Sequence, residues 1–579
     1  MDFDDILQDI GEFGRYQQLL LIIVILPSLI PGGFHGFSQI FSVGVPEDYW
    51  CRLPPSLCQN FTENDAKKYF LPQEGAGNAT RHSQCRMFDV DPDQFLDLVT
   101  NLTVPRSTPT IPCQHGWEYD RSVYRSTIAT DWDLVCDKDF FPTLSLFINT
   151  VGTLVGSLIF GYLIDRIGRK KTFFLVLAIQ IASGLATAAA PEFWTFCFFR
   201  FFNGLTLIPS WIIPFILCME LIGPSKRAPV GTTMSLALTL GVISLAGVAW
   251  LIRDWVQLQL AVTLPFVVFL GYWWFLPESP RWLLSQGKFD ETMDIVRRIA
   301  KVNGVKLREN YIEEMFAKYK AAKALAADHK QYDAFDLFRT PNLRKKTIVI
   351  IFDTFCVYSV YNGLNFFVPH LGSEEHISFL LASLVELPSY LVLYLTLNRF
   401  GRRPVLLLSM VLGGAFCILC SVVPENNDHL VKVTFLISKF CITCSYFVTD
   451  LFATELFPTV VRGAGASLSQ TISAVGLCFS PLIAYFAHKL FYLPLLIFGL
   501  LSIVGGVVSM ILPETVNQPL PETLEEGEEF GKTHRWTAWA RSPSQSPASI
   551  TIHQRRSDGD VETSRNLLGG NGLSPQRAA

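Results

Sequence analysis

The sequence predicts an all-α membrane protein whose twelve transmembrane helices form two pseudo-symmetric six-helix bundles, with a large loop after the first helix. Half of the 579 residues are hydrophobic and only 17% are charged, which is too apolar for an ordinary soluble domain. Twelve stretches reach the length of about 20 apolar residues that a spanning helix needs. Three short motifs also recur roughly 235 residues apart. Composition, span length and repetition therefore agree on one architecture.

The twelve stretches fall into two groups of six that are separated by a long polar segment. The first group lies near residues 18–40, 141–164, 173–191, 194–222, 229–251 and 258–276, and the second near 346–369, 377–398, 404–423, 431–456, 464–487 and 491–512.

Basic residues set the orientation of these spans. Arg166 and Arg169 follow the second stretch, Lys226 follows the fourth, Arg399 follows the eighth, and the segment 277–345 is rich in Lys and Arg. Short cytoplasmic loops carry an excess of such cations. We therefore expect all of these loops, and both chain termini, on the cytoplasmic side of a multi-pass protein.

The same reasoning divides the chain into regions. The polar tail, with its RSPSQSPAS and QRRSDGD stretches, has the composition of a disordered segment. The expected regions are a cytoplasmic N-terminus (1–17), an N-terminal bundle (18–276) that includes the extracellular loop 41–140, a cytoplasmic connector (277–345), a C-terminal bundle (346–512) and a cytoplasmic, largely disordered tail (513–579).

The loop 41–140 carries the marks of an extracellular segment. It holds three N-glycosylation sequons, at Asn60, Asn78 and Asn101. It also holds five cysteines, which outside the cell favour disulfides. Five is an odd number, so one cysteine is left without a partner in the loop.

Paired motifs at nearly constant offset indicate two homologous halves. The segment Asp165-Arg-Ile-Gly-Arg aligns with Asn398-Arg-Phe-Gly-Arg, and each half also has a Glu followed seven residues later by an Arg. Repeats of this kind are typical of secondary transporters. The repeated residues that we expect to act in gating are Asp165, Arg166, Arg169, Glu220, Arg227, Glu278, Arg281, Arg399, Arg402, Glu455 and Arg462.

These gating residues lie where helices leave the bilayer on the cytoplasmic side. There, acids and cations can form ion pairs between helix ends. We expect such pairs to hold the two halves together when the outside is open and to break when the inside opens. The alternative is that the cations only anchor the helices, which would not require acids and glycines at fixed places.

The motif around Asp165 resembles the signature of the major facilitator superfamily. The finer resemblance is to its organic ion transporters, solute carrier family 22. It rests on IGEFGRYQ (10–17), CQHGWEYD (113–120), TDWDLVC (130–136), IRDW (252–255), PESPRWLLSQGKFDE (277–291), TELFPTVVRG (454–463) and LPETVNQPLPET (512–523).

This resemblance covers residues 1–525 and implies several properties. They are the major facilitator fold, alternating access, a plasma-membrane location and polyspecific transport of small organic ions. The resemblance also implies that the disulfides join Cys51, Cys85, Cys113 and Cys136, with Cys58 as the additional cysteine.

The positions that track substrate charge in this family do not assign this chain to either class. Anion transporters of the family carry basic residues where this sequence has Tyr390 and Ala474. Cation transporters typically carry an Asp near the position of Ala474, and Gln or Glu at the position of Phe447. The resemblance by itself therefore leaves the charge class open.

Three acids inside the predicted spans are better indicators of the substrate's charge. An ionisable residue in a membrane is costly and is usually functional. They are Asp353, Glu386 and Asp450. Because the middles of the spans 346–369, 377–398 and 464–487 contain no Lys or Arg, we expect a cavity that repels organic anions. Asp353 is the preferred substrate anchor, since it is the deepest and the least expected from the family.

Each of these acids has a tyrosine that we place on the same helical face. Tyr361 follows Asp353 by eight residues, Tyr390 follows Glu386 by four, and Tyr446 precedes Asp450 by four. An acid beside aromatic rings suits an ammonium group, through charge and through cation–π attraction of roughly 0.5–2 kcal/mol per ring.

Other interpretations of the same residues stay open. Glu386 belongs to a pattern shared across the family, so a structural role is an alternative. Asp450 can pair with a cytoplasmic-side cation or with Lys439 instead of a substrate. His35 can face the cavity and titrate near neutrality, or it can pack between helices.

The sequence thus predicts a plasma-membrane secondary transporter that moves small organic cations or zwitterions, such as amines, betaines or carnitine-like molecules. One alternative is an organic anion transporter of the same family, and another is a glycosylated receptor that does not transport. Enzymatic activity, a cofactor, a metal and a nucleic-acid partner have no supporting motif. The expected partners are the substrate and the lipid bilayer, while the exact substrate, coupling ion and oligomeric state are open.

Overall fold

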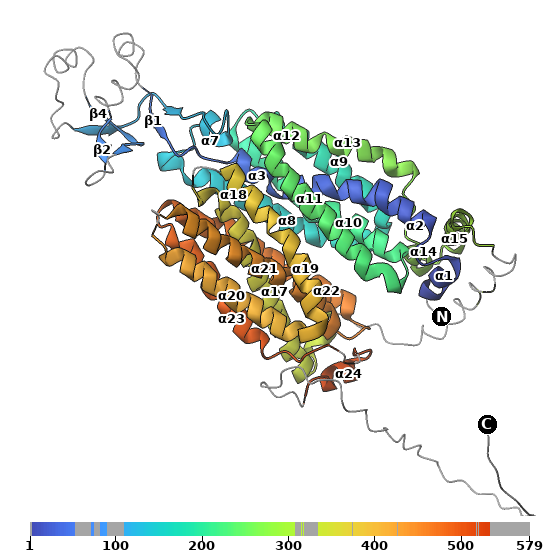
Figure 1. The fold of residues 1–579 in the computed structure, drawn as a ribbon. Coiled ribbons are helices and arrows are strands. Elements are labelled where there is room, and N and C mark those ends of the chain that lie inside the picture. The colour runs from blue at the N-terminus through green and yellow to red at the C-terminus, as the bar shows by residue number, and fades with distance from the viewer. Residues whose placement is uncertain are drawn as a thin grey trace, which may run out of the picture. The chain divides into compact units, whose positions relative to one another are not determined.

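The computed structural model describes residues 3–52, 71–74, 81–89, 109–306, 314, 317, 334–372, 375–424, 427–516, 518 and 520–532. In this part of the chain, twelve helical spans are long and apolar enough to cross a membrane, which confirms the predicted number. They form two bundles of six, coloured blue to green and yellow to red in Figure 1.

The N-terminal half starts with a short helix that precedes the first span. Proline stands in the first turn of several of its helices, where no intrahelical amide bond is lost. The elements are α1 (Phe3–Ile10); α2 (Arg15–Leu19), a π-helical turn (Leu20–Ile25) and α3 (Leu26–Ser42), which together make the first span; α8 (Phe140–Ile167); α9 (Arg169–Ala188); α10 (Phe193–Leu221); α11 (Pro224–Leu251); and the sixth span, made of α12 (Trp255–Thr263), α13 (Pro265–Phe269) and a 3₁₀ turn (Leu270–Trp274).

The C-terminal half repeats this plan, and its second span is divided into two helices. The connector between the halves contributes two helices to the described structure, and a last short helix follows the final span. The elements are α14 (Pro280–Ser285) and α15 (Phe289–Asn303) of the connector; α17 (Pro341–Phe367); α18 (Glu375–Leu384) and α19 (Glu386–Phe400); α20 (Arg402–Val422); α21 (Asp428–Leu456); α22 (Arg462–Tyr485); α23 (Tyr492–Ser509); and α24 (Leu524–Glu529).

The segment between the first two spans forms a small domain, called here the loop domain. It contains three antiparallel strand pairs: β1 (Tyr49–Cys51) with β6 (Trp117–Tyr119), β2 (Gln73–Glu74) with β3 (Arg81–His82), and β4 (Arg86–Phe88) with β5 (Thr110–Pro112). It also contains the short helix α7 (Ile128–Asp131). Strand pairs of this length are not stable alone and need additional links.

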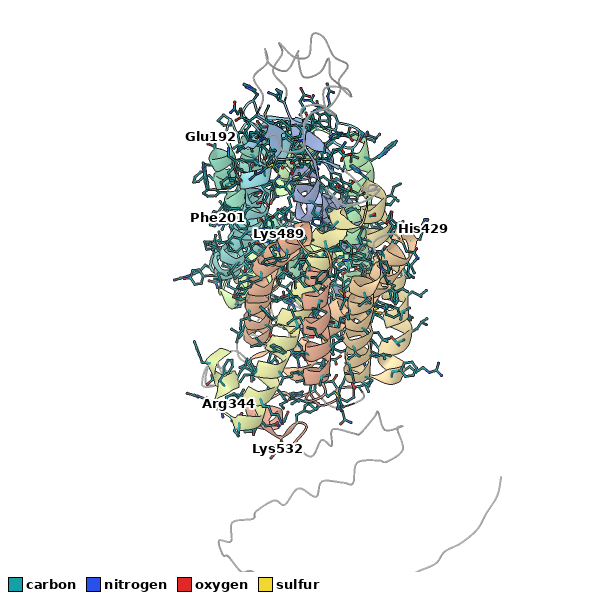
Figure 2. The ribbon with its side chains drawn as sticks, turned by 90° about the vertical axis from the view of Figure 1, so that its left-hand side faces the viewer. Glu192, Phe201, Arg344, His429, Lys489 and Lys532 are labelled. Carbon is teal, nitrogen blue, oxygen red and sulfur yellow. A yellow bond between two sulfur atoms is a disulfide. The ribbon has the colours of Figure 1, made fainter. Side chains whose placement is uncertain are left out.

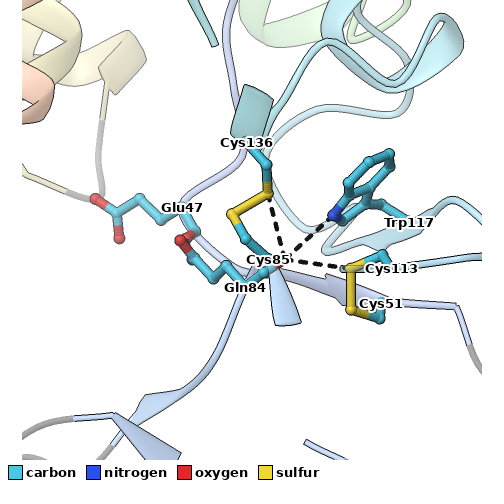
Figure 3. Close-up of a disulfide and its surroundings, with 7 residues drawn as sticks. All are labelled: Glu47, Cys51, Gln84, Cys85, Cys113, Trp117 and Cys136. Carbon is cyan, nitrogen blue, oxygen red and sulfur yellow. Dashed lines mark hydrogen bonds between the residues drawn. A yellow bond between two sulfur atoms is a disulfide. The ribbon is translucent and has the colours of Figure 1, made fainter. Parts of the chain in front are cut away.

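Two disulfides supply these links, and they use the four cysteines that the family resemblance implies. Cys51 is joined to Cys113 and Cys85 to Cys136. In Figure 3 the two bridges flank Gln84, whose backbone carbonyl accepts a hydrogen bond of 3.2 Å from the Trp117 indole. Cys58 and the sequons at Asn60, Asn78 and Asn101 lie outside the described residues.

The two halves are packed together at the end of the bundle that carries the loop domain, called here the loop end. A single apolar cluster there contains Phe41 and Leu245 of the first half and Phe367 and Phe379 of the second. The ring centroids of Phe41 and Phe379 are 5.1 Å apart. The other two large apolar clusters each lie within one half. This is the arrangement of a protein that is closed at its loop end.

The opposite end carries α14, α15 and α24 and is called here the connector end. Figure 2 places Arg344 and Lys532 at this end, with Glu192, Lys489 and His429 nearer the loop domain. The helix α1 packs at the connector end, where Asn303 donates a 2.9 Å hydrogen bond to the Ile10 carbonyl. Charged residues thus mark both ends of an apolar bundle.

Candidate functional site

Five aromatic side chains meet in the interior of the C-terminal half, and we call them the aromatic cage: Tyr358, Tyr361, Tyr390, Tyr446 and Phe447. The centroid of the Tyr446 ring lies 4.6 Å from that of Tyr358 and 4.5 Å from that of Tyr361. The rings of Tyr390 and Phe447 are 4.5 Å apart. Helices α17, α19 and α21 thus contribute to one cluster of electron-rich rings.

Asp450 places a carboxylate at one side of this cage. It lies one helical turn from Tyr446 on α21 and accepts hydrogen bonds from the Tyr358 hydroxyl (3.1 Å) and the Gln470 amide (2.9 Å). Within the described residues it forms no ion pair. The hydroxyl and the amide therefore hold the carboxylate in place without neutralising it.

The Asp450 side of the cage is partly accessible. Gln470 lies near the middle of α22 and bonds to both Asp450 and Tyr358, so it points into the C-terminal half. Its side chain is nevertheless exposed, and Asp450 is only partly buried. A residue that points inward and is still exposed lines a cavity, and a membrane protein tolerates polar groups at such a place.

The second acid beside the cage, Glu386, is already paired. Its carboxylate lies 3.2 Å from the Lys439 ammonium and accepts a 2.7 Å hydrogen bond from the Tyr361 hydroxyl. Lys439 also donates to the Asn365 amide oxygen at 2.9 Å. The exposed fractions of the two charged side chains are 0% for Lys439 and 5% for Glu386. This is a buried, hydrogen-bonded ion pair.

This pair corrects two expectations from the sequence. Lys439 pairs with Glu386 and not with Asp450, so it is Glu386 whose charge is balanced. The expectation of a cavity without a core cation is also wrong, because the Lys439 ammonium lies 3.7 Å from the Tyr361 ring centroid. One face of that ring is therefore occupied, and of the two acids beside the cage it is Asp450 that has no cationic partner among the described residues.

Tyr390 connects the cage to the other half of the protein. Its hydroxyl lies 3.1 Å from that of Thr239 on α11. This hydrogen bond between the halves adjoins the Phe447 ring. A relative movement of the halves therefore has to change the cage.

Asp353 does not reach the cage. Its side chain is fully buried, with neither oxygen hydrogen-bonded to a described residue. It shares a helix face with Cys356, Val360 and Leu364, which are all buried. Eight residues at 3.6 per turn place Asp353 about 80° around the helix from Tyr361, so the two do not lie on one face as expected.

Two other predicted residues lie apart from the cage or behind it. Ala474 of α22 is 2% exposed, and so is buried in the packing of its helix. His35 belongs to the other half, where its ring contacts Phe266 with the centroids 5.1 Å apart. It is 6% exposed, as expected for a histidine that packs between helices.

At the connector end, the repeated motif of the first half forms a compact set of ion pairs. Gly168 has a φ of 99°, a conformation that glycine adopts readily, and it turns the chain from α8 into α9. The Arg169 guanidinium then lies 3.0 Å from Glu220 and 3.3 Å from Asp165. Glu278 accepts the Arg169 backbone amide at 2.8 Å.

The second half has the same construction. Gly401 has a φ of 96°, and the Arg402 guanidinium lies 3.0 Å from Glu455. Glu514 accepts the backbone amides of Arg402 (2.9 Å) and Arg403 (3.0 Å). The two turns are therefore equivalent in backbone and in their glutamate partners, as the sequence repeat predicts, while the Asp165 pair has no counterpart at Asn398.

Arg227 and Arg462 make the same hydrogen bond through the Nε atom of the guanidinium. The Arg227 Nε donates to the Ile222 carbonyl at 3.2 Å, and the Arg462 Nε donates to the Phe457 carbonyl at 3.3 Å. Their remaining contacts differ. Arg227 and Arg281 share Asp4 of α1, whereas Arg462 Nη2 has no hydrogen-bond partner among the described residues.

All of these ion pairs join residues of one half and not residues of opposite halves. Among the described residues no ion pair joins the repeated motif of one half to that of the other, in a structure that is closed at the other end. Two further predicted cations contact rings and not acids: the Arg166 Nε donates to the Tyr162 hydroxyl at 2.8 Å, and Arg399 lies 5.7 Å from the Phe400 ring centroid.

Sequence reasoning did not single out Tyr358, Gln470 or Asp4. Tyr358 precedes Tyr361 by three residues and Gln470 precedes Ala474 by four, so helical spacing from a predicted residue is a signal for both. Asp4 has no comparable signal, because its partners Arg227 and Arg281 lie more than 200 residues away in the chain.

Comparison with known proteins places these features in a wider group. The profile of the family described as "Sugar (and other) transporter" matches residues 119–526. The chain is 40% identical to the Drosophila melanogaster carcinine transporter (92% of this chain, 80% of that protein) and 38% identical to its beta-alanine transporter (91% and 89%). It is 31% identical to mouse solute carrier family 22 member 21 (96% and 99%). The inward-open xylose transporter XylE of E. coli superposes with a TM-score of 0.55 at 14% identity, over 87% of this chain and 98% of that one.

Proposed function

The chain belongs to the sugar (and other) transporter family and, within it, to the organic ion transporters of solute carrier family 22; from this we propose that it carries small organic cations or zwitterions, with Asp450 as the anchor for the substrate's ammonium group. The observation that carries the proposal is the environment of Asp450. It is a partly exposed carboxylate with no cationic partner in the described structure, next to the aromatic cage.

The chemistry of the cage fits an ammonium ion. The carboxylate supplies charge, and rings within about 6 Å of a cation add roughly 0.5–2 kcal/mol each. Tyr358 and Gln470 donate to Asp450, so the carboxylate is oriented before the substrate arrives. A substrate ammonium replaces water at this carboxylate. The Asp450 side chain does not have to change its orientation when the ammonium binds.

Because Glu386 is paired with Lys439, Asp450 is the acid of the cage that can bind a cation. Lys439 is saturated by Glu386, Asn365 and the Tyr361 ring, so it offers no free charge to an organic anion. Asp450 repels the anion in addition. An organic anion transporter is therefore the weaker alternative for this site.

A zwitterion also fits the geometry. One amide hydrogen of Gln470 is directed to Asp450, and the amide has a second hydrogen that can donate to a substrate carboxylate. The ammonium and carboxylate groups of a short ω-amino acid can then lie beside Asp450 and Gln470. The similarity to a beta-alanine transporter and a carcinine transporter supports both classes of amine.

Alternating access supplies the transport mechanism. The halves meet at the loop end, while the connector-end ion pairs stay within each half, so each half can move as a unit. We infer that the loop end faces the outside of the plasma membrane, because disulfides such as Cys51–Cys113 persist in oxidising compartments. The connector end and both termini then lie in the cytoplasm.

Uptake in oocytes tests the proposal directly. Labelled tetraethylammonium, β-alanine and para-aminohippurate are compared for the wild type, Asp450→Asn and Asp450→Glu at matched surface expression. We expect uptake of the cation or the zwitterion, loss of this uptake in Asp450→Asn, and partial recovery in Asp450→Glu. Asp353→Asn is a useful contrast, since Asp353 lies away from the cage.

Two results would overturn the proposal. Uptake of para-aminohippurate alone would show that the carrier selects anions. Full cation uptake by Asp450→Asn would show that the anchor lies elsewhere in the protein.

A further inference from the structure

A second cavity lies at the loop end, separate from the aromatic cage. Its volume is about 420 Å³, and its walls come from the loop domain and from both halves. No cage residue lines it. Cavities of about 300–1,000 Å³ are typical of small-molecule sites, so this one can hold a compact organic ion.

The walls of this cavity carry three carboxylates, those of Glu47, Asp139 and Glu375. All of the lining residues are described, and they include His370 but no lysine or arginine. The lining is therefore net negative.

Two of these carboxylates accept hydrogen bonds from hydroxyl groups and not from cations. Asp139 accepts a 2.8 Å hydrogen bond from Tyr485 of the opposite half. Glu375 accepts one from Tyr124 of the loop domain. Glu375 is 9% exposed, and Glu47 is close enough to act on it electrostatically. Carboxylates that face one cavity with no lysine or arginine in its lining favour a cationic occupant.

Aromatic side chains form the remaining walls. Tyr49, Phe366, Tyr485 and Phe491 all line the cavity. Burial, and next the charge of Asp139, raise the pKa of Tyr49, so this phenol stays neutral and its ring stays available to a cation. Carboxylates and aromatic faces in one cavity are the chemistry that recognises alkylammonium ions.

We propose that the loop-end cavity is a second binding site for small organic ammonium ions, distinct from the transport site at Asp450. The proposal rests on the substrate class and the membrane orientation inferred above. An ion arriving from outside meets this site before it reaches the cage.

The position of the cavity gives the bound ion a regulatory effect. Its walls include Asp139 and Tyr485, which belong to opposite halves and whose hydrogen bond must break when the loop end opens. A ligand that fits between closed halves binds the closed state more tightly and shifts the equilibrium towards it. High external concentrations of the ammonium ion therefore slow its own uptake.

Equilibrium binding of labelled tetraethylammonium to the purified full-length protein in lipid nanodiscs tests this site. We expect two classes of site in the wild type. Asp450→Asn should remove one class, and Glu47→Gln should weaken the other while it leaves the first in place. Glu192→Gln is the matched control, since Glu192 is an exposed acid at the same end that does not line the cavity.

The uptake assay provides the second measurement. We expect inhibition of wild-type uptake at high tetraethylammonium concentration, and relief of that inhibition in Glu47→Gln but not in Glu192→Gln. A single class of sites that Asp450→Asn abolishes would overturn the second site and leave the transport proposal intact. Two classes that both persist in Asp450→Asn would instead contradict the transport anchor. Size-exclusion profiles of each variant separate loss of binding from loss of folding.

Discussion

The two halves of the protein share one scaffold at the connector end and differ in their interiors. The turns at Gly168 and Gly401 have φ values of 99° and 96°, and each places an arginine 3.0 Å from a glutamate of a neighbouring helix. In the interior, only the second half carries the aromatic cage with Asp450. The difference teaches that a repeat preserves the parts that hold the helices, while the binding chemistry diverges.

The interior of the first half holds a different charge. Arg200 of α10 is 3% exposed, and its guanidinium lies over the Phe196 ring with 4.9 Å to the centroid. Two of its nitrogens have no hydrogen-bond partner among the described residues. The buried charges of the second half, Lys439 and Glu386, are by contrast paired with each other. The first half thus buries an arginine that is unpaired among the described residues, while the carboxylate and the cage that suit a cation lie in the second half.

The largest effect is expected where the second half differs most, at its buried ion pair. Lys439→Met leaves the Glu386 charge unpaired inside the bundle, which typically costs about 3–5 kcal/mol. The thermal unfolding temperature of the purified protein should fall strongly. The double variant Lys439→Met with Glu386→Leu should recover most of the stability, because neither charge is then left buried alone.

A result in which the double variant is no more stable than the single variant would contradict this account. It would mean that Lys439 stabilises the fold through Asn365 and the Tyr361 ring and not through Glu386.

The next effect tests the equivalence of the two turns. Gly168→Ala and Gly401→Ala each place a side chain at a positive φ with a ψ of 164° or 167°, a conformation essentially restricted to glycine that costs on the order of 1–3 kcal/mol. The added Cβ would also lie 2.4 Å from a Glu278 oxygen or 2.6 Å from a Glu514 oxygen. We expect similar losses of thermal stability and transport rate in the two variants, measured side by side. Gly247→Ala on α11 is the control, because no atom lies within 4 Å of its added Cβ.

Markedly unequal losses would show that the two turns are alike in geometry but not in function. The two halves would then have diverged at the connector end as well as in their interiors.

A smaller effect is expected within the cage. Tyr358→Phe removes one hydrogen bond to Asp450, and a hydrogen bond to a charged group contributes about 1.5–3 kcal/mol at most. Gln470 still donates to the carboxylate, so we expect a several-fold higher KM for the cation with little change in folding. Tyr162→Phe, which removes an exposed hydroxyl at the connector end of the other half, should leave KM unchanged.

An equal change of KM in both tyrosine variants would indicate a general effect on the bundle. A change in Tyr358→Phe alone locates the effect at Asp450.

The smallest effect concerns the asymmetry at the connector end. Asp4→Asn removes the acid that Arg227 and Arg281 share, while Arg462 pairs with no acid in the described part of the chain. These side chains are 19–31% exposed, so solvent screens the pairs and the loss of stability should be about 1 kcal/mol or less. Faster hydrogen exchange in α1, with unchanged exchange in α22, is the expected measurement. Unchanged exchange in α1 would show that its apolar residues suffice to hold it.

Sequence reasoning succeeded where a property belongs to one helix or one repeated motif. Spans of about 20 apolar residues identify the membrane helices, and the spacing of Tyr446 and Asp450 places both at the cage. It failed for Asp353, because an interval of eight residues drifts away from a common face.

The sequence by itself therefore determined the twelve spans, the two-fold repeat and a set of acids and tyrosines in the second half. Only the tertiary structure decided that Lys439 pairs with Glu386, that Gln470 donates to Asp450, and that Asp4 reaches Arg227. The physical reason is that periodicity sets the face of a residue on its own helix. Which neighbouring helix that face meets, and at what depth, depends on how separate helices pack.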